Sequence, residues 1–202
     1  PSVIRSNVRL YVTLLVLALF NISIQIFMPY LILYYTETLK MDDYVLIFAP
    51  AIVAAAVFTG IYGGVYDRKG FRSAIVPTLI LLMVGYVGLY FFRSKLPVFV
   101  FSLIMMCGYL GSSAILGAKV RTHTPENKSG MFQGQRIICQ VLIPGIIGPA
   151  IGAAVLKNAQ QIVDSDGRLV FLPNANIFLA ALIAAVGILV ALIPIIKSLK
   201  KR

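Results

Sequence analysis

Six long apolar runs constrain the fold of this chain more than any other feature. Each is close to the roughly 20 residues that an α-helix needs to cross about 30 Å of hydrocarbon. In lipid every backbone N–H and C=O group needs an internal partner, and six spans with short links cannot close a barrel, so the runs are predicted to be helices. The predicted spans are 10–36, 43–65, 73–92, 97–120, 131–156 and 177–196.

The composition indicates a surface that faces lipid rather than water. The 202 residues are 59% hydrophobic and 12% charged, with a mean hydropathy of +0.92, whereas soluble domains carry about 25% charged residues. We therefore expect one all-α membrane domain, residues 1–202, in contact with the lipid bilayer. No basic stripe remains outside the apolar runs, which argues against a nucleic-acid partner. Cys107 and Cys139 lie inside apolar runs without ligand spacing, which argues against a disulfide or zinc site.

The basic residues indicate how the spans are oriented. If the amino terminus is cytoplasmic, 13 of the 18 Lys and Arg residues lie on the inner side and 5 on the outer side. This bias predicts a multi-pass protein of the cell membrane with both termini in the cytoplasm. The inner set is Arg5, Arg9, Arg68, Lys69, Arg72, Lys119, Arg121, Lys128, Arg136, Lys197, Lys200, Lys201 and Arg202, and the outer set is Lys40, Arg93, Lys95, Lys157 and Arg168.

The spans differ in polarity, and the order of that difference predicts a repeat. The third and sixth spans have almost no polar residue in their middles, as expected of lipid-facing helices, whereas the first, fourth and fifth carry several. Polar groups at membrane depth are costly without partners, so those three are predicted to face an interior. The order predicts two three-helix repeats, the second inverted relative to the first because each has an odd number of spans.

The link between the second and third spans carries the most specific motif. It reads Gly63-x-x-x-Asp67-Arg68-x-Gly70-x-Arg72. This resembles the signature loop of the major facilitator superfamily, which lies between helices two and three of a six-helix half. The sequence departs from that pattern at Phe71, where many members have a basic residue, and this weakens the charge of the loop.

The resemblance implies a gate at this loop rather than a substrate site. In the family the loop is thought to latch the outward-facing state, which would make Gly63, Asp67, Arg68, Gly70 and Arg72 gating residues. Gly70 permits a tight turn, and either arginine is expected to pair with Asp67 or with groups on a facing half. Gly60 and Gly64 form a small-xxx-small pair that would let a helix approach closely. The alternative is a link that carries only membrane-anchoring charges.

Two further stretches give weaker signals. Residues 121–130 are similar to the family's link between the fourth and fifth spans, and the single histidine, His123, is expected to be a solvated residue of that loop. The fifth span contains Gly148-Pro149, similar to a motif in the fifth helix of the superfamily's drug antiporters, from which the neighbouring residues depart. Its alternative meaning is structural, because Gly and Pro in a spanning helix allow close packing and a kink.

Polar residues inside the spans are the candidate substrate contacts. Asn21 and Gln25 share one face of the first span by their i, i+4 spacing. On the fifth span Gln133, Arg136 and Gln140 fall on one stripe by the same spacing. Arg136 would bind an anionic group or join a charge network around Asp67. The alternative for the amides is a hydrogen bond between neighbouring helices. The candidates are Asn21, Gln25, Tyr109, Ser112, Arg136 and Gln140.

Some chemistry is missing from the sequence. No Asp or Glu lies in the middle of a span, so the chain offers no evident proton carrier. No metal-binding helix motif, nucleophile elbow or phosphate loop is present. We expect no enzyme activity, no catalytic residues, no metal and no cofactor.

The resemblance implies a secondary active transporter that moves a small solute by alternating access. Such transporters have about twelve spans in two halves, so this chain is expected to be one half of a major facilitator fold, with the other six-helix half and a small-molecule substrate as partners. The basic ending and the opening at Pro1 favour the carboxyl-terminal half. The competing class is a non-transporting membrane sensor or assembly protein that retains the fold.

Overall fold

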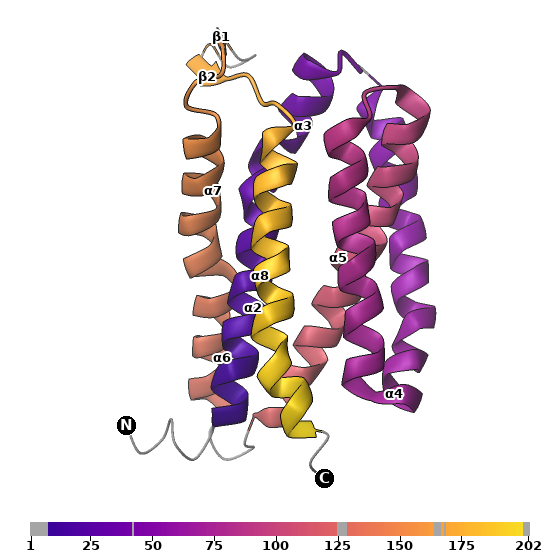
Figure 1. Ribbon diagram of the computed structural model, residues 1–202, viewed down its shortest axis with the longest axis vertical. Coiled ribbons are helices and arrows are strands. Elements are labelled where there is room, and N and C mark those ends of the chain that lie inside the picture. Colours follow the sequence, from indigo (N-terminus) through magenta and orange to yellow (C-terminus); the bar gives the residue numbers. More distant parts are fainter. Residues whose placement is uncertain (1–7, 42, 125–128, 164–166, 168, 200–202) are drawn as a thin grey trace.

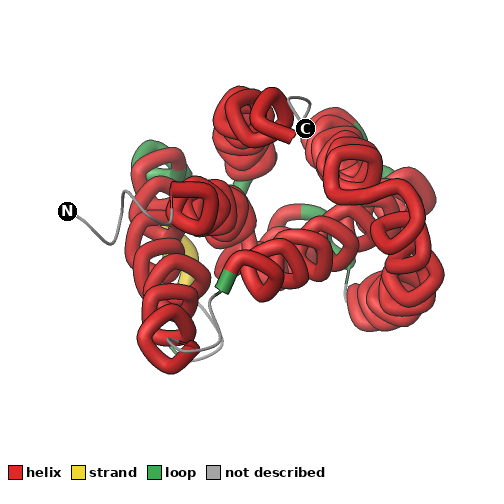
Figure 2. Tube along the Cα trace, turned by 90° about the horizontal axis from the view of Figure 1, so that it is seen from below, coloured by secondary structure: helices red, strands yellow, loops and turns green. Residues whose placement is uncertain are grey.

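The computed structural model describes residues 8–41, 43–124, 129–163, 167 and 169–199. The described chain is a bundle of long helices with a small β-hairpin at one end (Figure 1). We call the end of the bundle where α2 begins and α8 ends the lower end, as drawn in Figure 1, and the end with the hairpin the upper end. Seen from below in Figure 2, the helices lie side by side.

The helices follow the predicted spans. The first predicted span is α2 (Val8–Phe27), which continues through two short irregular turns and α3 to residue 38. The second and third spans lie within α4, the fourth is α5, the fifth is interrupted and the sixth is α8. The remaining bounds are η1 Met28–Tyr30, α3 Leu31–Leu33, η2 Tyr34–Thr38, α4 Tyr44–Phe91, α5 Lys95–His123, α6 Ser129–Ile137, η4 Ile138–Leu142, α7 Ile143–Val155, β1 Gln161–Val163, β2 Leu169–Phe171 and α8 Asn176–Leu199.

Helix α4 contains the tightest reversal in the described chain. Its 48 residues are broken at Gly70, whose backbone has φ 78° and ψ 176°. Residues 44–69 and 71–91 are therefore two segments. They lie side by side near the break, where the Tyr62 hydroxyl donates a 3.3 Å hydrogen bond to the Ala74 carbonyl. In the part of the chain that the structure describes, five helices are long and apolar enough to cross a membrane, with α4 counted as one.

A short β-hairpin accompanies the helices, and the structure is otherwise helical, in line with the predicted all-α membrane class. Strand β1 pairs antiparallel with β2, with Ile162 opposite Val170. Gly167 precedes β2 with φ 75°, a conformation that favours glycine. The hairpin lies at the upper end, outside the apolar belt, where backbone groups need no helix to satisfy them (Figure 1).

The core of the bundle surrounds α2. Phe27 of α2 packs against Tyr86 of α4 and Phe178 of α8, with ring centroids 5.3 and 5.6 Å apart. Beside them the buried Ser23 hydroxyl donates a 2.8 Å hydrogen bond to the Ala181 carbonyl and lies 3.3 Å from the Tyr86 hydroxyl. One polar side chain thus joins three helices at membrane depth.

The polarity of the spans predicted their burial only in part: α2 and α5, expected to face an interior, are the most buried of the long helices, whereas the third, fifth and sixth spans differ from the expectation. Residues 71–91 and α8, expected at the periphery, each bury one face, which includes Leu82 and Ala185 at 0% exposure. The fifth span, expected to face an interior, exposes large side chains such as Ile146 at 65%. The reason is that apolar side chains suit lipid and protein equally, so hydropathy alone does not separate the two surroundings.

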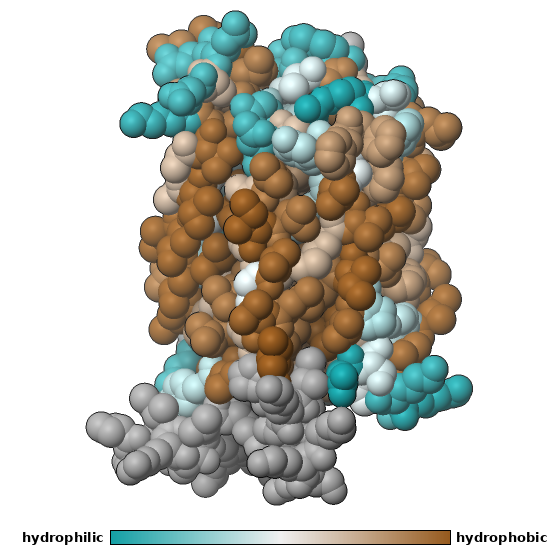
Figure 3. All heavy atoms as spheres, viewed as in Figure 1, coloured by the Kyte–Doolittle hydropathy of each residue, from teal (hydrophilic) through white to brown (hydrophobic). Residues whose placement is uncertain are grey.

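The surface divides into a belt and two ends. On the face shown in Figure 3, apolar residues cover the middle of the bundle, and hydrophilic residues lie above it and at both sides of its lower end. Together with the five long apolar helices, this pattern is that of a multi-pass membrane protein.

Candidate functional site

The motif predicted from the sequence lies at the lower end of α4. Gly63 and Asp67 belong to the last turns of the segment 44–69, and Gly70 makes the reversal. Arg68 and Arg72 stand on either side of Gly70, and both are exposed. The prediction that Gly70 permits a tight turn is confirmed, because a φ of 78° is costly for any residue with a side chain.

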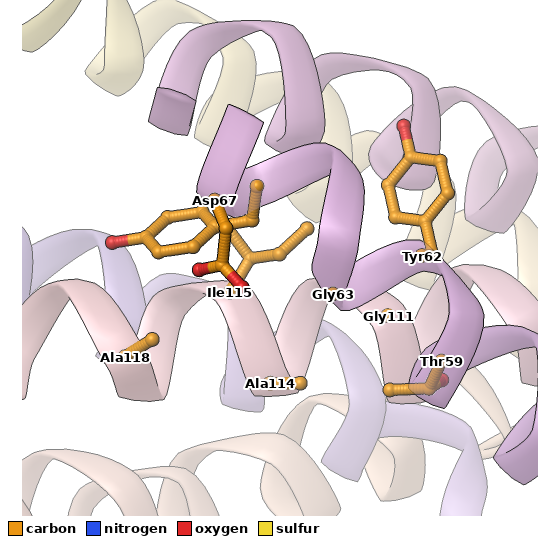
Figure 4. A pocket seen from close by; sticks show the side chains of 9 residues that line it. Thr59, Tyr62, Gly63, Asp67, Gly111, Ala114, Ile115 and Ala118 are labelled. Carbon is orange, nitrogen blue, oxygen red and sulfur yellow. The ribbon is translucent and has the colours of Figure 1, made fainter. Parts of the chain in front are cut away.

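Asp67 lines a pocket between the first segment of α4 and α5. The pocket has a volume of about 230 Å³. In Figure 4 the Asp67 side chain points toward α5, where Ala114 and Ala118 leave room for it. The residues that line the pocket are Thr59, Tyr62, Gly63, Tyr66, Asp67, Gly111, Ala114, Ile115 and Ala118. A carboxylate at the mouth of a largely apolar hollow is suited to accept a cationic or hydrogen-bonding side chain.

The predicted pairing of Asp67 with an arginine is not formed in this structure. Among the described residues the ion pairs are Lys40–Glu37 at 3.1 Å and Lys95–Asp43 at 2.6 Å. Both lie at the upper end of the bundle. The exposed Asp67 carboxylate forms no ion pair among the described residues, although the other charged residues of the α4 link are basic.

Phe71 does more than reduce the charge of the loop. It is 5% exposed, and the Lys119 ammonium of α5 lies 5.4 Å from the centre of its ring. A cation over an aromatic face is stabilised by about 0.5–1 kcal/mol at such sites. The structure therefore brings a basic group from α5 to the position where the family pattern has one in the loop.

The two small-xxx-small pairs behave differently. A Cβ added at Gly60 or Gly64 would meet no atom within 4 Å, so no helix in the described chain approaches there. A Cβ at Gly152 of α7 would lie 2.5 Å from the Ile26 carbonyl of α2, and one at Gly148 would collide with Gln25. The structural interpretation of the fifth span is thus confirmed at these two glycines.

The two candidates on α2 are engaged within the bundle. The Asn21 amide donates a 2.8 Å hydrogen bond to the Leu17 carbonyl of the preceding turn. Gln25 packs against Gly148 of α7, at the point where α2 and α7 are in contact. Both side chains are half-buried.

On α5 one of the two predicted cavity contacts, Ser112, is buried between helices, and the other, Tyr109, is partly exposed. Ser112 is fully buried, and its hydroxyl donates a 2.9 Å hydrogen bond to the Thr78 hydroxyl of α4. Tyr109 is half-buried and stacks on Phe20 of α2, with centroids 6.2 Å apart. Ser112 thus ties α5 to α4, because a hydroxyl at membrane depth is best satisfied by another helix.

Arg136 does not join a charge network with Asp67. Its Nε donates a 3.1 Å hydrogen bond to the Gln140 amide oxygen, one turn along the fifth span. Its terminal nitrogen lies 3.4 Å from where a Cβ at Gly117 of α5 would stand. The small residue at position 117 therefore leaves space for the guanidinium between the two helices.

Two features of the lower end were not predicted. His123 belongs to the last turn of α5 rather than to a solvated loop, and its Nδ1 lies 3.5 Å from the hydroxyl of the buried Thr13. The Gln135 amide donates a 3.4 Å hydrogen bond to the Tyr11 hydroxyl, while its oxygen is buried and has no hydrogen-bond partner among the described residues. Residues 125–128 of the second predicted loop lie outside the described residues. Among the described residues no three potential metal ligands gather.

Comparison with known proteins gives one match. A family model described as Major Facilitator Superfamily matches residues 1–149, which include the α4 link and the Asp67 pocket. Comparisons with the curated proteins and with the solved structures give no match.

Proposed function

The chain belongs to the major facilitator superfamily, a family of transporters, and we propose that it is a secondary active transporter that moves a small solute by alternating access. The observation that carries the proposal is the family match over residues 1–149. The Asp67 pocket at the lower end of the membrane-spanning bundle supports it.

We propose that the chain is one six-helix half made of two inverted three-helix repeats. The break at Gly70 supports this, because it divides α4 into two segments that each match a predicted span. With that division the described spans alternate in direction along the chain, as inverted repeats require. The three spans of the first repeat would be α2 and the two segments of α4.

The surface of α4 supports a second half as partner. In the first segment Leu46 and Ile61 are 71% and 76% exposed, and the open glycines lie on the same segment. Small residues let helix backbones approach closely in membranes. We propose that the other half contacts this segment and that the pathway for the solute runs between the halves.

The Asp67 pocket is proposed as the gate. Asp67, which has no ion pair among the described residues and lies beside the reversal at Gly70, would be available to a donor from the facing half in one state and released in the other. Such a contact biases the equilibrium between two conformations only if it forms in one of them. The lower end would then be cytoplasmic, which the exposed Arg68, Lys69 and Arg72 support.

Transport by purified full-length protein in proteoliposomes tests the proposal. Flux of a solute, with turnover that falls at least tenfold in Asp67→Asn while substrate affinity changes little, is the expected result. Glu37→Gln is the matched control, because it removes a carboxylate at the upper end that forms only an exposed ion pair. Unchanged turnover in Asp67→Asn would remove this residue from the gate. Absence of flux for every solute tried, with binding of a protein partner, would favour the sensor or assembly class.

A further inference from the structure

Positive charge gathers at the reversal of α4. Arg68, Lys69 and Arg72 stand within five residues of the chain, and all three side chains are exposed. The ion pairs among the described residues both lie at the upper end of the bundle, so none of these three cations is paired within that part of the chain. Asp67, the carboxylate of the link, points toward α5 in Figure 4. The reversal therefore presents basic groups that are available to an external anion.

Helix α5 brings a further basic group to this turn. The Lys119 ammonium lies 5.4 Å from the centre of the Phe71 ring, and Phe71 directly precedes Arg72. Arg121 is exposed as well, but it stands two residues after Lys119 and is therefore turned by about 200° around the helix. The cations at the reversal thus come from both α4 and α5, whereas Arg121 projects to the other side of α5.

An apolar stripe begins above Arg72 on the second segment of α4. Ile80, Val84 and Val87 are exposed and recur at intervals of four and three residues, so they lie on one face of the helix. Arg72 stands eight residues before Ile80, a spacing that returns to the same side of a helix, about 12 Å lower along its axis. A lipid of the lower leaflet has its phosphate and its acyl chain in this same order.

From this arrangement we propose that the reversal binds an anionic phospholipid of the leaflet at the lower end. The phosphate contacts Arg72 and Lys69, and one acyl chain lies along the stripe past Ile80. Clusters of basic residues beside spanning helices recognise anionic head groups, and a guanidinium can donate two parallel hydrogen bonds to a phosphate. A second copy of the chain fits less well, because a symmetric contact through this face would bring the same cations together. A soluble phosphate would leave the stripe unused.

The inference concerns lipid binding and does not rest on the proposed transport or on the second half. It is tested with a tryptophan in the stripe, because the 202-residue chain contains none. Ile80→Trp places this reporter on a side chain that is 49% exposed. The full-length protein is reconstituted in phosphatidylcholine nanodiscs with increasing fractions of a phospholipid whose chains are dibrominated near their middle. Quenching by dibrominated phosphatidylglycerol and by dibrominated phosphatidylcholine is compared, after the signal of the protein without the substitution is subtracted.

Phosphatidylglycerol should quench position 80 with a preference of about fivefold or more over phosphatidylcholine, since each basic residue near an anionic lipid contributes about that factor. On the Ile80→Trp background, Arg72→Gln should lower this preference by about threefold to fivefold, and Arg72→Lys should retain part of it. Arg121→Gln is the matched control, because it removes an exposed cation of the same end from the other side of α5. It should change the preference by less than about twofold, since salt screens charges that lie farther away.

Four results would overturn the proposal. Equal quenching by the two lipids would mean that the surface does not select an anionic head group. Equal losses in Arg72→Gln and Arg121→Gln would mean that the preference reflects the general charge of the lower end. Absence of quenching by either lipid in a folded protein would mean that a protein surface covers the stripe. A preference that inorganic phosphate removes, and that chloride at equal ionic strength does not, would assign the cations to a soluble anion. If Arg72→Gln does not fold, an unchanged preference in Lys69→Gln overturns the contact with the head group.

Discussion

The two segments of α4 use glycine in opposite ways. In the second segment a Cβ added at Gly85 would lie 2.5 Å from the Met105 Cβ of α5, and one added at Gly88 would collide with the Phe101 ring. In the first segment a Cβ at Gly60, Gly63 or Gly64 would meet nothing within 4 Å. The same residue type therefore marks a closed helix contact in one segment and an open surface in the other.

The spacing of small residues therefore shows where another helix can approach closely, not whether one does. The second segment and α5 form a hairpin in which backbone lies against backbone, as glycine contacts in membranes allow. The first segment keeps the same capacity without a neighbour on its glycine face in the described chain. The comparison separates glycines that hold the described bundle together from glycines whose surface is open to a partner.

Gly108→Ala should produce the largest loss of stability. The added Cβ would lie 2.8 Å from the Thr78 carbonyl oxygen and closer still to the backbone of Leu82, and backbone cannot move aside as a flexible side chain can. Overpacking of this kind costs about 3 kcal/mol. Thermal unfolding in detergent measures it, with Gly187→Ala as the control because that site is open. A melting temperature equal to that of the control would mean that the α4–α5 contact is looser than described.

Gly148→Ala should have the next largest effect. Its Cβ would lie 2.8 Å from the backbone carbonyl carbon of Gln25, so α7 must move away from α2, at a cost of about 2 kcal/mol. Gly145→Ala on the same helix, where nothing lies within 4 Å, controls for helix propensity. Denaturation of both variants in parallel gives the difference. Equal stability of the two would argue against the glycine contact between α7 and α2.

Ser112→Ala should cost about 1 kcal/mol, because it removes a buried hydrogen bond to Thr78 between two helices. Substrate affinity should stay unchanged, since the hydroxyl is buried in the α4–α5 contact. Ser113→Ala, one residue on and half-buried, is the control. Weaker substrate binding in Ser112→Ala with unaltered stability would restore the cavity role that the sequence suggested.

Gly64→Ala should have the smallest effect on stability, less than about 0.5 kcal/mol, as expected of an open site. Turnover in proteoliposomes should nevertheless fall severalfold, since we propose that the other half approaches this face. Gly85→Ala, which should lose stability, is measured in parallel. The two variants together distinguish a glycine in a formed helix contact from a glycine on an open surface. Full turnover in Gly64→Ala would mean that no helix docks there.

The sequence predicted the membrane class, the helical spans and the motif at the α4 link, because hydrophobic length and positive-φ glycine are local properties. It did not predict that one residue makes the whole reversal at Gly70, or that Phe71 is buried beneath Lys119. It also assigned Ser112 to a cavity. The spacing of a serine along a span is the same whether its hydroxyl faces water or a threonine on the next helix. Only the three-dimensional structure shows that Ser112 contacts Thr78.

Gln135 illustrates the same limit. Its neighbours Gln133, Arg136 and Gln140 formed the predicted polar stripe, whereas Gln135 lies toward Tyr11 of α2. Gln135 cannot share the face of that stripe, because its offset of one residue from Arg136 turns its side chain by about 100° around the helix. The π-helical turn after α6 shifts that angle further, and no sequence pattern used above predicts a π-turn.

The reversal at Gly70 also bears on how the protein is made. With a single residue between its two segments, α4 is expected to enter the bilayer as one helical hairpin. During synthesis the first segment is made before the second, and its backbone N–H and C=O groups are already hydrogen-bonded within its own helix. A longer turn would let the two segments insert separately, and the short turn would no longer fix the position of Asp67 relative to α5.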